Sequence, residues 1–137
     1  MSTLYKKTIL VICVYIIVGM LLISCQSQDK KIAIPPIEIW NETKLTKLMY
    51  SRVFIVNKES DKVQIRDFLS TAQPTNLDIY DSSNPFVFEI QIQYGTNNEE
   101  QYWRVHEVNG EYFLKDAIGN TWKTNGEFFM MLEKLYN

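Results

Sequence analysis

The chain has 137 residues and a formal net charge of −2, with 14 basic and 16 acidic side chains. This length suits one domain with one hydrophobic core. The weakly acidic balance offers no basic patch for a phosphate backbone, so no nucleic-acid partner is expected. The single histidine excludes a metal site built from several histidines.

Residues 1–24 have the pattern of a secretory signal peptide. Lys6 and Lys7 precede a run from Ile9 to Ile23 that contains no charged residue. As a helix, about 15 residues span about 22 Å, whereas a bilayer core requires about 20 residues. The run therefore favours the hydrophobic segment of a signal peptide over a permanent transmembrane helix.

The run ends in Leu22, Ile23, Ser24 and Cys25. This order resembles the lipobox of bacterial lipoproteins: an aliphatic residue, a tolerant position, a small residue and the cysteine. The resemblance implies transfer of a diacylglyceryl group to the sulfur of Cys25 and cleavage before it. Two acyl chains hold a protein on a membrane essentially permanently. We therefore expect attachment to the extracytoplasmic face of the cell membrane, or to the outer membrane in a Gram-negative cell. The other interpretation is an uncleaved signal anchor with an incidental cysteine.

Cleavage leaves 113 residues with a formal charge of −4, because the signal holds two lysines and no acidic residue. Cys13 is removed and Cys25 is lipidated, so no thiol remains for a disulfide, catalysis or zinc ligation. We expect no metal and no cofactor. Polar residues and Pro35-Pro36 predict a tether over 25–36 and a single domain over 37–137.

Two strands are expected at the start of the domain. Alternation over 37–40 predicts a short strand, and residues 43–50 leave the assignment open. The stretch 52–56 is rich in β-branched residues and predicts a buried strand.

A helix is expected next, over 60–72, with Ser60 or Asp61 as its N-cap and an end before Pro74. Apolar residues recur at i, i+3, i+4 and i+7, which places them on one helix face. They are Ile65, Phe68, Leu69 and Ala72. The polar stretch 75–85 that follows is typical of a loop.

The clearest strand covers 86–94, where large apolar residues occupy every second position and mostly polar residues lie between them. A period of two puts the apolar residues on one dry face. They are Phe86, Phe88, Ile90, Ile92 and Tyr94. One dry and one wet face favour an antiparallel sheet.

Three further strands and a helix are expected at the carboxyl end. The dipeptide Asn109-Gly110 predicts a tight hairpin between strands over 102–108 and 111–115. A short strand follows over 121–123, and Thr124 with Glu127 resembles a capping box that begins a helix. The order β-β-α-β-β-β-β-α predicts an α+β fold: an antiparallel sheet of four to six strands packed on one side by two helices.

Several short motifs within residues 50–136 occur together in one known family. They are Val53–Val56, Phe68–Ala72, Asn84-Pro85, Tyr94-Gly95, Tyr102-Trp103 and Asp116 before Thr121-Trp122. On these motifs the chain resembles the YhfM-like lipoproteins, a family of unknown function. The chain departs from the family pattern at Asp116–Gly119. Because the family has no assigned activity, the resemblance implies no functional residue.

Catalytic chemistry has little support in the sequence. His106 lies beside Tyr102 and Arg104 on a face that we expect to be solvated, and no nucleophile motif accompanies it. The carboxylates of Glu89, Glu107 and Glu111 on neighbouring strands leave a cell-envelope hydrolase as the alternative. An oxygen-rich stretch, Asp78–Asn84, lacks the spacing of a calcium loop and is interpreted as a polar loop.

The favoured function is a non-enzymatic binding or accessory module at the cell envelope, with an envelope protein or a glycan as the candidate partner. Most aromatic residues are expected to fill the core, but exposed aromatic side chains beside polar groups can bind sugars or proteins. The candidate binding surface consists of Tyr102, Trp103, Arg104 and His106.

Overall fold

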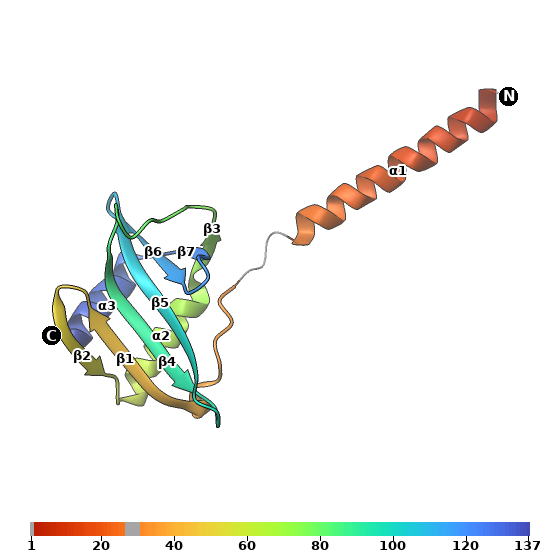
Figure 1. The fold of residues 1–137 in the computed structure, drawn as a ribbon. Coiled ribbons are helices and arrows are strands. Elements are labelled where there is room, and N and C mark those ends of the chain that lie inside the picture. The colour runs from red at the N-terminus through yellow and green to blue at the C-terminus, as the bar shows by residue number, and fades with distance from the viewer. Residues whose placement is uncertain (1, 27–30) are drawn as a thin grey trace. The chain divides into compact units, whose positions relative to one another are not determined.

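The computed structural model describes residues 2–26 and 31–137, and the chain divides into two compact units, Met1–Lys30 and Lys31–Asn137 (Figure 1). The described part of the first unit is one helix, α1 (Ser2–Gln26), on which Cys13 is exposed. The side chains of the lipobox residues 22–25 lie outside the described part, as do residues 27–30 of the predicted tether. Among the helices that the structure describes, none is both long and apolar enough to cross a membrane.

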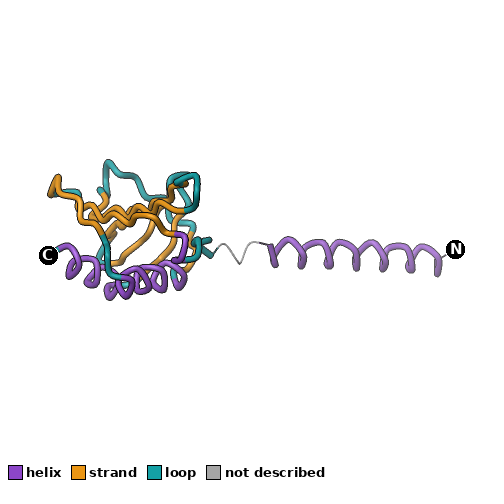
Figure 2. Tube along the Cα trace, turned by 90° about the horizontal axis from the view of Figure 1, so that it is seen from below, coloured by secondary structure: helices purple, strands orange, loops and turns teal. Residues whose placement is uncertain are grey.

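The second unit is built on an antiparallel sheet in the strand order β2-β1-β4-β5-β6-β7-β3. Its strands are β1 (Trp40–Lys47), β2 (Tyr50–Ile55), β3 (Gln73–Thr75), β4 (Phe86–Tyr94), β5 (Glu99–Val108), β6 (Glu111–Asp116) and β7 (Thr121–Thr124). The helical elements are η1 (Ile37–Ile39), α2 (Glu59–Thr71) and α3 (Gly126–Tyr136). Both α2 and α3 lie along one face of the sheet (Figure 2). The predicted α+β class is confirmed, with seven strands in the described sheet rather than four to six.

The additional strand is β3, where the sequence suggested only the end of a helix. Pro74 pairs with Trp122 of β7 at the edge of the sheet. Proline has no N–H to donate, so an edge strand is where a sheet accepts it. The start of the domain also differs, because residues 37–39 form a 3₁₀ turn and the strand runs over 40–47.

The predicted N-caps of both helices, Ser60 or Asp61 for α2 and Thr124 for α3, are wrong. The N-cap position of α2 is Lys58, without a side-chain bond to the helix. The N-cap of α3 is Asn125, one residue after Thr124, and its Oδ1 accepts a hydrogen bond from the Phe128 N–H at 3.0 Å.

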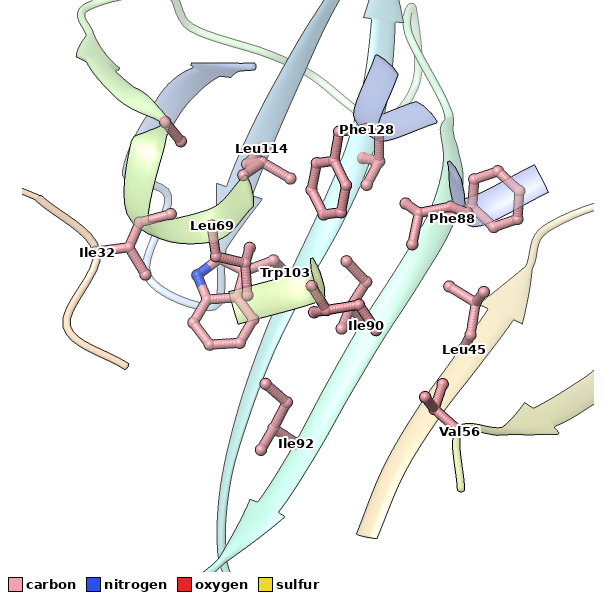
Figure 3. Close-up of a cluster of buried hydrophobic side chains, with 14 of the residues drawn as sticks. Ile32, Leu45, Val56, Leu69, Phe88, Ile90, Ile92, Trp103, Leu114 and Phe128 are labelled. Atoms are coloured by element: carbon pink, nitrogen blue, oxygen red, sulfur yellow. The ribbon is translucent and has the colours of Figure 1, made fainter. Parts of the chain in front are cut away.

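The hydrophobic core lies between the sheet and the two helices (Figure 3). Its fully buried residues include Leu45, Ile65, Leu69, Phe88, Ile90, Ile92, Val105, Leu114, Phe128 and Leu132. The prediction for β4 is wrong at Phe86. A register shift between Phe86 and Phe88 turns Phe86 to the opposite face, where it pairs with His106.

Candidate binding site on the outer face of the sheet

The face of the sheet opposite α2 and α3, here called the outer face, is partly covered by the loop 76–85. Thr121 Oγ1 donates to the carbonyl of Leu77 at 2.8 Å, and Lys115 Nζ donates to the carbonyl of Ile79 at 2.8 Å. Ile79 itself is buried although it does not belong to the main core. The loop is therefore fastened to the outer face by side chains of β6 and β7.

His106 lies beneath this loop, and the expectation of a solvated face is wrong at this position because the side chain is 0% exposed. Its Nδ1 donates to the carbonyl of Asn84 at 2.7 Å, since a carbonyl oxygen only accepts. Its Nε2 is buried and has no hydrogen-bond partner among the described residues. Burial lowers the pKa of His106, and the Asn84 carbonyl and the Asp81 carboxylate oppose that shift without cancelling it.

Arg104 is the centre of a charged cluster beside His106. Its Nε donates to Glu89 at 2.9 Å and its Nη1 to Asp81 at 2.9 Å. The guanidinium carbon lies 4.6 Å from the centre of the Phe86 ring, within the range of a cation–π contact. The hydrogen bond with Glu89 raises the pKa of Arg104, although partial burial acts in the opposite direction.

Lys115 of β6 is directly opposite Arg104 of β5 in the sheet. Like charges in directly opposed positions destabilise a sheet. The Lys115 ammonium lies 3.7 Å from the Asp81 carboxylate, which therefore faces both cations. His106 Nε2 lies 3.6 Å from the same carboxylate.

The candidate surface expected from the sequence is divided between the two faces. Arg104 and His106 point to the outer face, and Tyr102 shares it because residues two apart in a strand point the same way. Trp103 points toward the helices and is 3% exposed. The prediction of an exposed binding surface is therefore wrong at Trp103.

Asp81 and Lys115 also belong to the cluster, although neither was predicted from the sequence as a site residue. A signal for Lys115 was available, because a two-residue turn at Asn109-Gly110 fixes the register that places it opposite Arg104. No comparable signal marks Asp81, whose place depends on how a long loop folds back.

A hollow lies on the helix side of the sheet, beside Trp103. It has a volume of about 300 Å³ and is lined by Trp103, Trp122, Gln101 and Ile118, among others. Gln101 Oε1 is buried and without a hydrogen-bond partner within the described part of the chain. This hollow is mainly apolar, in contrast to the charged cluster of the outer face.

The three carboxylates considered for hydrolysis are dispersed. Glu89 binds Arg104, and Glu111 pairs with Lys123 at 2.8 Å. Glu107 follows His106 directly and so points to the other face of β5. Within residues 2–26 and 31–137, no group of three or more His, Cys, Asp or Glu side chains is placed to hold a metal ion.

No family model, curated protein or solved structure matches the chain. The resemblances to lipoproteins and to the YhfM-like family therefore remain predictions from the sequence.

Proposed function

We propose that this chain is a lipid-anchored bacterial lipoprotein. Its domain is a non-enzymatic binding or accessory module on the extracytoplasmic face of the cell membrane. The observation that carries the proposal is Leu22-Ile23-Ser24-Cys25 at the end of an uncharged run that follows Lys6 and Lys7. A diacylglyceryl thioether on Cys25 supplies two acyl chains, enough for stable attachment without any other contact with lipid.

The arrangement of the domain is compatible with this role. A separate compact unit begins at Lys31, and it contains no cysteine that oxidation outside the cytoplasm would cross-link. Ile32 is buried in its core. The segment between Cys25 and the folded unit is therefore short, and the domain is expected to act close to the membrane.

Metabolic labelling with radioactive palmitate tests the anchor directly. In a bacterium that expresses the full chain, wild-type protein and Cys13→Ala should incorporate label, whereas Cys25→Ala should not. Cys13 is the matched control because it is the other cysteine and lies in the part predicted to be removed. Intact mass should show loss of residues 1–24 and gain of lipid in the labelled forms. Label on Cys25→Ala, or its absence from wild type, would refute the proposal.

Binding through the outer face is tested by replacing Tyr102 with a photo-crosslinking amino acid and irradiating cells that express the protein. We expect the outer-face probe to give a discrete adduct with an envelope protein or glycan. Met130 on α3 is the control position because its side chain is 70% exposed. Identical adducts from both positions would contradict a specific outer-face site.

A further inference from the structure

The outer face contains an arrangement of charge that the fold alone does not need. Arg104 and Lys115 are directly opposed on β5 and β6, two internal strands of the sheet. Such a like-charge pair is unfavourable unless an anion lies between or beside the two cations. Their positions are set by the sheet, because both strands pair on both sides.

His106 adds a third nitrogen at the same place. Its ring is 0% exposed and Nδ1 is occupied by the Asn84 carbonyl. Nε2 faces the Asp81 carboxylate from 3.6 Å, which is too far for a hydrogen bond. A buried polar atom without a partner is costly and rare in a native fold.

Asp81 is the group that fills this place in the structure. One carboxylate oxygen, Oδ2, lies 2.9 Å from Arg104 Nη1, and the other, Oδ1, lies 3.6 Å from His106 and 3.7 Å from Lys115. Among the described residues its carboxylate accepts one hydrogen bond, from Arg104. Its side chain is 44% exposed and comes from the loop rather than from the sheet.

We propose that Arg104, Lys115 and His106 form a binding site for a carboxylate group, in which Asp81 is an internal occupant that an external carboxylate displaces. This assignment deepens the proposed binding module and rests on it for the biological role of the ligand. Without Asp81, the cations Arg104 and Lys115 with the anion Glu89 leave one net positive charge beside a neutral imidazole. A carboxylate is the favoured ligand because the group that already occupies this place is the carboxylate of Asp81.

An external carboxylate can satisfy the site better than Asp81 does, because the loop backbone does not restrict its approach. Since Nδ1 donates to Asn84, Nε2 must take up a proton from solvent before it can donate to the ligand. The groups that face His106 are Asp81 from the loop, Arg104 from β5 and Lys115 from β6. A bound anion offsets the repulsion that the two cations exert on an imidazolium. Carboxylate binding is therefore coupled to protonation of His106.

The chain has one histidine, so nuclear magnetic resonance of the full-length protein labelled with [¹⁵N]histidine in detergent micelles reports on this site alone. The protein is titrated with acetate, a blocked aspartyl peptide and inorganic phosphate, each against sodium chloride of equal ionic strength. We expect acetate to give a saturable shift of Nε2 toward the protonated position. Tighter binding of the peptide would identify a peptide carboxylate as the source, and equal binding a free small carboxylate.

The Asp81→Ala variant should bind acetate more tightly than the wild type. The gain is about tenfold if the Asp81 carboxylate leaves the wild-type site free about a tenth of the time. Glu111→Ala removes the same charge from an exposed pair on the same face and should bind as wild type does. Asp81→Asn serves as the second variant, and near-ultraviolet circular dichroism verifies the fold of each.

Three results would overturn the assignment. The first is that acetate gives no saturable shift beyond that of chloride in the wild type and in the Asp81 variants. The second is tighter binding of phosphate than of acetate, and the third is an unchanged Kd for acetate in Arg104→Gln. Palmitate labelling is measured separately, so failure of this site and failure of the lipid anchor are distinguishable.

Discussion

The loop 76–85 covers the candidate site, and replacing Thr121 by valine tests what holds it. Thr121 is 7% exposed, and its single O–H is shared between two carbonyls, that of Leu77 at 2.8 Å and that of Thr75 at 3.1 Å. Valine keeps the size and branching of the side chain but removes the donor. A net hydrogen bond contributes about 1 kcal/mol, and an acceptor left unpaired and buried costs about 1 to 3 kcal/mol. We therefore expect Thr121→Val to lower the free energy of unfolding by about 2 kcal/mol.

Two measurements on the full-length protein in detergent check this expectation. For a domain of about 100 residues, each kcal/mol lowers Tm by about 4 °C or more. Hydrogen exchange within 76–85 should accelerate more than exchange in β4 and β5, because the bond ties the loop to the sheet. Thr124→Val on the same strand is the control, since Thr124 lies three residues from Thr121 and its side chain therefore points to the opposite face from the loop. If both variants have the same Tm and the same loop exchange, the role assigned to Thr121 is wrong.

Three further predictions concern stability. Burial lowers the pKa of His106, so the unfolded chain binds more protons below about pH 6.5. The contribution of His106 to the free energy of unfolding should be complete above that pH. It should be lost progressively as the pH falls below it. Denaturation over a pH series should show a shallower slope for His106→Gln, and an equal slope would contradict the assignment. Phe128→Ala empties a fully buried position and should cost about 3 to 5 kcal/mol, whereas Met130→Ala should change stability by less than about 0.5 kcal/mol. Asn125→Ala removes the cap of α3 and should cost about 1 kcal/mol in urea unfolding; no loss would show that the Phe128 N–H finds water instead.

The parts of the fold that local sequence determines were predicted. Asn109 and Gly110 both have positive φ, 53° and 80°, as the predicted tight turn requires. Helical periodicity located α2, whose Ile65 and Leu69 are fully buried. In each case the signal is a spacing within a few residues, which the chain has to satisfy whatever the rest of the fold does.

The features that were not predicted depend on contacts between distant residues. Nothing in the polar stretch 75–85 indicates that Ile79 is buried against the sheet, because that depends on bonds to Lys115 and Thr121. The register shift that turns Phe86 outward leaves the alternation of the sequence intact and so gives no local signal. The burial of His106 combines both effects, since the loop covers it and Phe86 packs against it with ring centres 6.4 Å apart.

The two sides of the carboxylate site differ in how firmly they are held, and this difference determines which side gives way to a ligand. Arg104 lies between Trp103 and Val105, both buried, so the core fixes its backbone. Asp81 can leave the site by rotating its own side chain while the bonds of Thr121 and Lys115 keep the loop closed. Displacement by side-chain rotation predicts that Thr121→Val leaves the Kd for acetate unchanged although it destabilises the loop. A clearly tighter Kd in that variant would instead mean that the loop itself must open before a carboxylate can bind.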